Sequence, residues 1–145
     1  MPEIVCSSAV PGDLVAAKRL LAECGLPNAD VDKHFSQFTI ARNGSRVAGV
    51  AGLESAGATG LLRSLAVAAD ERNQGIGEAL CEAVFAGARK KGMTRLYLLT
   101  TDAPAYFERF DFFVVARDDA PPEIQATDQF SVLCPSTSIL MVKEL

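Results

Sequence analysis

The sequence predicts a mixed α/β (α+β) fold with a mostly antiparallel central sheet and helices on both faces. Asn43-Gly44 lies between two runs of strand-forming residues and predicts an antiparallel hairpin. Strand Leu61–Val67 leads through a glycine-containing loop into a helix and then into strand Thr94–Thr100, which predicts a β-α-β crossover. A hairpin and a crossover in 145 residues give a mixed sheet in one domain, residues 1–145.

The amino-terminal half has clear helix boundaries. Apolar residues recur at helical spacing after Pro11-Gly12-Asp13, and Gly25 and Pro27 end that helix. The predicted elements of this half are strand Ile4–Ser7, the helix just described, short helix Asn28–His34, and strands Phe35–Arg42, Arg46–Leu53 and Leu61–Val67.

The next helix begins at Gly75 and carries an apolar face that includes Leu80 and Val84. It ends in the cations Arg89-Lys90-Lys91 before Gly92, which is the end of a helix that favours positive charge. The remaining predicted elements are strand Thr94–Thr100, helix Pro104–Phe110, and strands Phe112–Ala116 and Ile139–Val142.

Composition excludes several classes of function. A net charge of −4 argues against a nucleic-acid surface. No apolar run approaches the length of a membrane span, and the amino terminus lacks the features of a signal peptide, so we expect a cytoplasmic protein without membrane contact. The four cysteines are far apart and form no Cys-x-x-Cys pair, so we expect neither a metal site nor disulfides.

The most specific motif is Arg72-x-x-Gly75-x-Gly77 between a strand and a helix. The two glycines let the backbone approach a ligand, and the helix start offers unpaired N–H groups and a positive dipole end, which together favour a phosphate. A dinucleotide site would need a third glycine and an acidic residue after the next strand, and both are missing.

This arrangement resembles motif A of the GNAT superfamily of N-acetyltransferases, and the predicted element order agrees over the whole chain. The resemblance implies the GNAT acyl-CoA N-acyltransferase fold and acetyl-CoA as acetyl donor, without a metal. It assigns coenzyme binding to Leu65, Ala66, Val67, Arg72, Asn73, Gln74, Gly75, Ile76, Gly77 and Phe107.

The segment Ala103–Phe112 is similar to motif B of the same superfamily, with two departures. The tyrosine that often protonates the departing thiolate falls on Phe107, while Tyr106 precedes it. Either Tyr106 serves as general acid, or no side chain does, because a thiol of pKa about 8.5 is a tolerable leaving group. The family glycine is Asp111, a residue type that tolerates a left-handed backbone.

Three further residues are candidates for catalysis and acceptor binding. Glu54, at the end of a strand, is the best-placed general base, directly or through a water; the alternative is a solvated glutamate. Ser64 is also a candidate catalytic residue, on the strand that carries the acetyl group. Arg63 interrupts this apolar strand and suits a bidentate bond with an acceptor carboxylate, the alternative being a surface arginine. Arg-Ser-Leu-Ala-Val here is similar to acetylglutamate synthases.

The carboxy-terminal segment Ile124–Met141 resembles the small ArsN-like acetyltransferases of bacterial arsenic-resistance operons. That resemblance implies an acceptor pocket with Gln129, Phe130 and Cys134, and transfer to the amine of a small carboxylate-bearing compound, including an organoarsenical amino acid. The alternatives are a non-catalytic acetyl-CoA-binding or sensor module, favoured by Phe107, and a protein N-acetyltransferase. A homodimer stays open as the oligomeric state.

Overall fold

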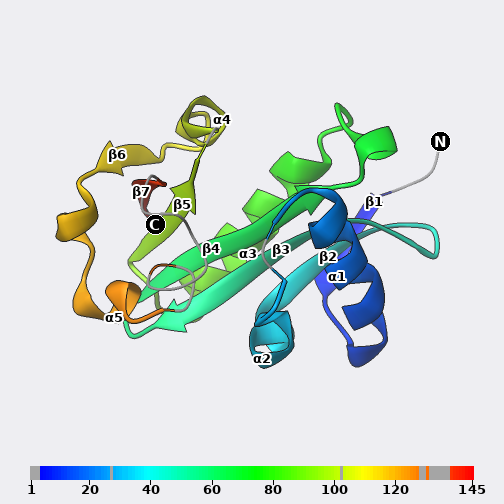
Figure 1. Cartoon of the computed structure of the whole chain (residues 1–145), viewed down its shortest axis with the longest axis horizontal. Helices are drawn as coiled ribbons and strands as arrows, with labels where there is room; N and C mark the ends of the chain where they lie inside the picture. Colours follow the sequence, from blue (N-terminus) through cyan, green and yellow to red (C-terminus); the bar gives the residue numbers. More distant parts are fainter. Residues whose placement is uncertain (1–3, 27, 102, 128–129, 131–137) are drawn as a thin grey trace. The chain divides into compact units, whose positions relative to one another are not determined.

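The computed structural model describes residues 4–26, 28–101, 103–127, 130 and 138–145 (Figure 1). The chain divides into two compact units. The first contains residues 1–53 and 64–87, and the second contains residues 54–63 and 88–145.

Among the described residues, seven strands form one sheet in the order β1-β2-β3-β4-β5-β7-β6. The β4–β5 pairing is parallel, and the other pairings described for β1–β2, β2–β3, β5–β7 and β6–β7 are antiparallel. This confirms the predicted mostly antiparallel mixed sheet. The strands are β1 Ile4–Ser8, β2 Phe38–Asn43, β3 Arg46–Ala56, β4 Thr59–Val67, β5 Arg95–Thr100, β6 Phe113–Val115 and β7 Ile139–Glu144.

The helices of the described chain are α1 Leu14–Glu23, α2 Val31–His34, α3 Ile76–Lys90, α4 Pro104–Glu108 and α5 Pro122–Gln125. Short 3-10 turns are η1 Pro11–Asp13, η2 Phe35–Gln37, η3 Ala69–Glu71 and η4 Arg117–Asp119. Within the described residues, none of these helices combines the length and the hydropathy of a membrane-spanning segment.

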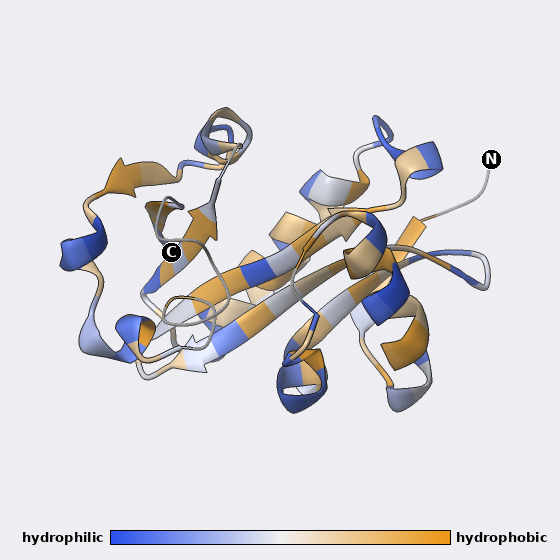
Figure 2. Cartoon of the chain, viewed as in Figure 1, coloured by the Kyte–Doolittle hydropathy of each residue, from blue (hydrophilic) through white to orange (hydrophobic). Residues whose placement is uncertain are grey.

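The core of the first unit lies between the β2–β3 hairpin and helices α1 and α2. Leu21 of α1 and Val31 of α2 are fully buried beside Ile40 of β2 and Val50 of β3. Hydrophobic residues follow the strands, whereas the segment between η3 and α3 is largely hydrophilic (Figure 2). The hairpin turn is Gly44-Ser45, with Gly44 at φ +63°, and Asn43 is the last residue of β2.

Helix α3 packs on the opposite face of β3 at Gly49. A Cβ placed on Gly49 would lie 2.9 Å from Leu80 Cδ1, and 3.1 Å from both Ile76 Cγ2 and the carbonyl oxygen of Ala66. Neighbouring residues of a strand face opposite sides, so Gly49 faces α3 while Val50 faces α1 and α2. Helices therefore cover both faces, as predicted, and the missing side chain lets the start of α3 approach β3 and β4.

The second unit has its own core. Leu61 of β4, Tyr97 of β5 and Leu140 of β7 pack with Ile124 of α5 in one buried cluster. Parallel strands β4 and β5 pair from Thr59 with Arg95 to Leu62 with Leu98. Helix α5 thus contributes Ile124 to this core, a contact that the strand pattern did not predict.

Cys81 on α3 is fully buried in the core. Desolvation, with smaller contributions from Glu82 and Glu78, raises the pKa of the Cys81 thiol to about 12. The thiol therefore stays protonated near neutral pH, where only the thiolate would be reactive.

The start of β2 was predicted wrongly, and the other strands also have bounds that differ from the predicted ones. Phe35–Gln37 forms η2 rather than the start of a strand, and β2 begins at Phe38. Phe35 is buried, and its ring centroid lies 5.5 Å from that of Phe38. In a regular strand, residues three positions apart face opposite sides of the sheet, so Phe35 and Phe38 could not enter the same core. The turn at η2 brings both rings into one core.

We predict that Gly49→Ala destabilises the protein by about 1–3 kcal/mol, because the added methyl group overpacks a core whose nearest neighbours include fixed backbone. Gly87→Ala on α3 is the matched control, since no atom lies within 4 Å of its Cβ position. This change should stabilise by about 0.5–1 kcal/mol through helix propensity. Urea unfolding of both variants measures the difference; equal stabilities would contradict the packing at Gly49.

Candidate active site

The loop between β4 and α3 has the backbone of an anion cradle. Asn73 and Gly75 have φ angles of +65° and +79°, and residues 72–75 are exposed. No atom lies within 4 Å of a Cβ placed on Gly75, so the space beside it is open. Alternation of ordinary and left-handed backbone turns successive N–H groups toward one side, which makes a concave anion site.

The start of α3 adds N–H groups to this cradle. The first helical hydrogen bond runs from the Ala79 N–H to the Gly75 carbonyl, at 3.0 Å. The N–H groups of Ile76, Gly77 and Glu78 precede this bond and point past the helix start, where the dipole is positive. The geometry fits a phosphate, so these residues fit the pyrophosphate of a coenzyme.

The Arg72 side chain turns back toward the end of β4. Its Nε donates to the Val67 carbonyl at 3.2 Å, and its Nη2 lies 3.7 Å from Cys24 Sγ. The Cys24 thiol is itself 3.8 Å from the Val67 carbonyl. The guanidinium is thus held beside the predicted coenzyme strand and remains exposed.

Strand β4 is irregular at the predicted acetyl position. Ser64 has φ +57°, a left-handed conformation that a serine rarely adopts inside a strand and that costs about 1–3 kcal/mol. The described pairing of β4 with β5 ends at Leu62, although β4 continues to Val67. Irregular strands often re-aim backbone groups beside active sites. Leu65–Val67 therefore follow a break in the regular strand.

Glu54 and Arg63 form a buried ion pair between β3 and β4. Arg63 Nη1 lies 3.4 Å from Glu54 Oε2, and the side chains are 0% and 9% exposed. Neither residue is therefore the solvated surface group that was the alternative prediction. A buried pair is costly to break, because removal of one partner leaves the other charge uncompensated.

The aromatic residues of α4 pack on one another. The Tyr106 ring lies 5.2 Å from Phe107 and 5.4 Å from Phe110, and the Arg109 guanidinium carbon lies 5.3 Å from the Tyr106 ring centroid. Tyr106 and Phe107 are both partly exposed.

The turn after α4 has the left-handed backbone that the sequence predicted, with Asp111 at φ +69°. Buried Lys143 donates from Nζ to the Phe110 carbonyl at 2.7 Å and so holds this turn in place.

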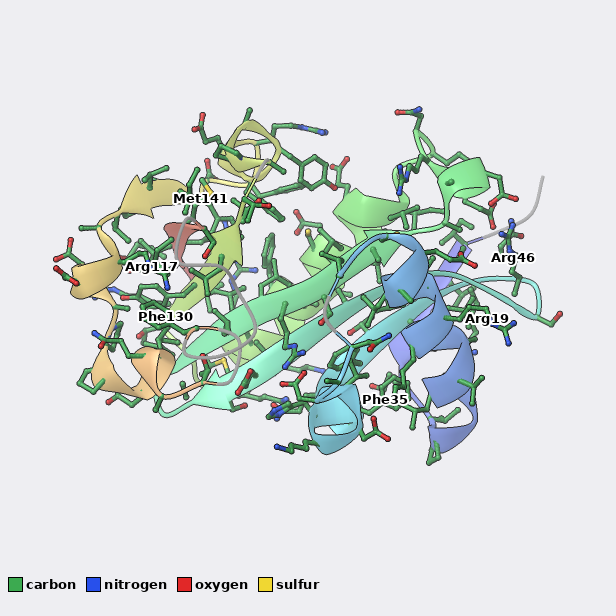
Figure 3. The ribbon with its side chains drawn as sticks, viewed as in Figure 1. Arg19, Phe35, Arg46, Arg117, Phe130 and Met141 are labelled. Carbon is green, nitrogen blue, oxygen red and sulfur yellow. The ribbon has the colours of Figure 1, made fainter. Side chains whose placement is uncertain are left out.

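Of the predicted acceptor-pocket residues, Gln129 and Cys134 lie outside the described residues. Phe130 lies beside Arg117, whose guanidinium carbon is 4.5 Å from the ring centroid (Figure 3). Arg117 Nη1 also donates to Ser138 Oγ at 2.8 Å. Arg117 therefore joins Phe130 to the residue that precedes β7.

The sequence did not predict three features of this site. They are the close approach at Gly49, the left-handed Ser64, and the anchoring of the loop, in which Asn43 Nδ2 donates to Glu71 Oε1 at 3.0 Å and Arg46 Nη1 donates to Asp70 Oδ2 at 2.8 Å. The Asn43-Gly44 pair predicted only the hairpin turn.

The family model of the acetyltransferase (GNAT) domain matches residues 34–114, more than half of the chain. The chain belongs to the GNAT family of acetyltransferases. The match includes the cradle, the Glu54–Arg63 pair and α4. None of the curated protein sequences matches this chain.

Solved structures of acetyltransferases share the fold. N-acetylglutamate synthase from Neisseria gonorrhoeae, solved with coenzyme A and N-acetyl-glutamate, has a TM-score of 0.83 and 25% identity, covering 100% of this chain and 36% of that chain. This chain therefore spans about a third of the synthase. Rv2747 from Mycobacterium tuberculosis, in complex with CoA and NLQ, has a TM-score of 0.84 and 19% identity, covering 97% and 99%. Ribosomal-protein-S18-alanine N-acetyltransferase from Escherichia coli has a TM-score of 0.76 and 19% identity, covering 98% and 94%.

We predict that Gly77→Val weakens acetyl-CoA binding more than tenfold, or about 1.4 kcal/mol, because a branched side chain blocks the approach of a phosphate to the helix start. Gly87→Val is the control, with the same substitution in the same helix. Calorimetric titration of both folded variants decides the matter. Equal acetyl-CoA affinities of the Gly77→Val and Gly87→Val variants would show that the cradle does not bind the coenzyme.

Proposed function

We propose that this GNAT-family acetyltransferase uses acetyl-CoA to acetylate the amine of a small, carboxylate-bearing, amino-acid-like compound. The observation that carries the proposal is the open cradle at the start of α3, with left-handed residues at positions 73 and 75 and open space beside Gly75. The helix-start N–H groups have no acceptor within the helix, and this arrangement suits the pyrophosphate of the donor.

On the donor side, the N–H groups of Ile76, Gly77 and Glu78 hold the pyrophosphate, and the exposed Arg72 guanidinium adds positive charge. When bound, acetyl-CoA supplies a thioester whose carbonyl carbon accepts the amine. Backbone N–H groups of Leu65–Val67, placed after the Ser64 irregularity, orient the acetyl carbonyl and stabilise the negative charge that develops on its oxygen. Phe107 of α4 contributes an apolar contact to the coenzyme.

On the acceptor side, Arg63 binds the carboxylate of the acceptor and Glu54 acts as the general base. In our proposal the planar guanidinium of Arg63 pairs with the acceptor carboxylate, a geometry that suits a bidentate bond. The Glu54 carboxylate takes the proton that the amine must lose, directly or through a water. A C–N bond forms, the C–S bond breaks, and the coenzyme leaves as its thiolate, or as the thiol if Tyr106 donates a proton.

Departure of the thiol does not require an acid at Phe107. A thiol with a pKa of about 8.5 leaves as the thiolate near neutral pH, so transfer proceeds with Tyr106 packed among aromatic rings or acting as donor. Phe107, which has no ionisable proton to donate, is therefore compatible with turnover.

Two similarities support the class of acceptor. The N-acetylglutamate synthase of Neisseria gonorrhoeae has 25% identity with this chain. The resemblance of the carboxy-terminal segment to arsenic-operon acetyltransferases adds an organoarsenical amino acid to the acceptors that we propose. The S18-alanine acetyltransferase, at 19% identity, shares the fold alone, so its protein substrate gives no support to a protein acceptor here.

The test is an acceptor screen with acetyl-CoA, read as release of free thiol. The screen offers amino acids, their amides, arsenical and phosphinic amino-acid analogues, and an amino-terminal peptide. We predict release with a free amino acid and at least about tenfold lower kcat/KM with its amide, which is the size expected for one lost charged contact.

The paired variant Arg63→Met, Glu54→Gln removes both charges and keeps the volume, so it avoids the uncompensated charge left by a single change. Its kcat should fall about a hundredfold or more, because Glu54→Gln removes the base. In the remaining turnover it should lose the preference for the carboxylate, while the KM for acetyl-CoA stays the same. A preference that survives in this variant would place the carboxylate site elsewhere. Binding of acetyl-CoA without thiol release for any amine would favour the sensor module.

A further inference from the structure

The loop that leads into the cradle begins with negative charges, which repel the coenzyme phosphates that we propose bind there. Residues 69–77 contain two carboxylates, Asp70 and Glu71, against one cation, Arg72. A pyrophosphate is a polyanion, so this segment would repel it unless another group cancelled the charge.

The tip of the β2–β3 hairpin supplies that group. Arg46 Nη1 donates to Asp70 Oδ2 and Nη2 donates to Asp70 Oδ1, both at 2.8 Å, which is a bidentate pair. The same Nη1 lies 3.6 Å from Glu71 Oε2. Figure 3 labels Arg46 at this end of the hairpin. One guanidinium therefore contacts both carboxylates.

Asn43 holds the second carboxylate in place. Its Nδ2 lies 3.0 Å from Glu71 Oε1 and 3.2 Å from Oε2, and Glu71 is only 6% exposed. A buried carboxylate is costly without hydrogen-bond donors, so Asn43 and Arg46 fix the position of Glu71. Arg72 follows Glu71 directly, so this contact also fixes the entry to the cradle.

We propose that Arg46 and Asn43 are positioning residues of the coenzyme loop, which hold its acidic start against the hairpin and cancel the charge that would otherwise repel the coenzyme phosphates. The inference rests on the proposed coenzyme site. It adds two residues outside the loop, Arg46 and Asn43, to the determinants of donor affinity.

The state of Asp70 is consistent with this role. The hydrogen bonds that Arg46 donates to Asp70 are the largest cause of both shifts: they lower the pKa of the Asp70 carboxyl and raise the pKa of Arg46. Both groups stay charged near neutral pH. Removing Arg46 therefore exposes a full negative charge at Asp70.

The experiment is calorimetric titration of coenzyme A into the wild type and Arg46→Met, at about 0.02 M and about 0.3 M salt. In the variant we expect affinity about three- to tenfold weaker at the lower salt, because unscreened carboxylates face the phosphates. The loss should shrink to less than about twofold at the higher salt. Affinity for pantetheine, which lacks the phosphates, should not change.

Two further variants separate charge from folding. Asp70→Asn added to Arg46→Met should restore most of the affinity, since it removes the exposed charge. Arg95→Met is the control, because Arg95 pairs with Glu144 at 3.0 Å with side-chain exposures of 53% and 61%, close to the 52% and 68% of Arg46 and Asp70. It changes the net charge equally and should leave coenzyme affinity unaltered.

Unchanged affinity in Arg46→Met would overturn the inference, as would an equal loss for pantetheine or a loss independent of salt. A wild type that binds no coenzyme A would overturn the proposed function and this inference with it. A wild type that binds coenzyme A while Arg46→Met binds it equally well would overturn this inference alone.

Discussion

The close packing of α3 on β3 and β4 is the constraint on which the candidate donor site depends. Gly49 lets Ile76 and Leu80 approach the strands, and these residues lie in the first turns of α3. The N–H groups at the start of that helix have no acceptor within it, so their position is set by the helix as a whole. A well-packed helix therefore fixes the N–H groups at the helix start, while the side chains of Asn43 and Arg46 hold the loop that precedes them.

Charge is arranged around this backbone site by separate contacts. Arg72 lies against the end of β4, and Arg46 cancels the carboxylates at the start of the loop. The protein has a net charge of −4 and yet binds, in our proposal, a polyanion. Local neutralisation resolves this conflict, because fields of exposed charges are screened within about 10 Å at ordinary salt.

Much of the architecture could be predicted because its signals are local. The Asn43-Gly44 pair predicted the hairpin, and the Arg72-x-x-Gly75-x-Gly77 spacing predicted the start of α3. In the structure the turn is Gly44-Ser45 and β2 begins at Phe38. The later start of β2 follows from packing between the rings of Phe35 and Phe38, which overrides the strand propensity of residues 35–37. The burial of Arg63 against Glu54 depends on pairing between distant strands, and the anchoring of Glu71 by Asn43 depends on contact between a hairpin and a loop. Neither leaves a pattern in the sequence.

The central claim is that backbone N–H groups at the start of α3 bind the phosphates of the coenzyme. Titration of ¹⁵N-labelled protein with coenzyme A measures this directly, since amide resonances report on groups that mutation cannot remove. The account predicts that the largest shifts fall on Ile76, Gly77 and Glu78, and that ADP reproduces them while pantetheine does not. Shifts confined to other segments, with these three amides unmoved, would contradict it.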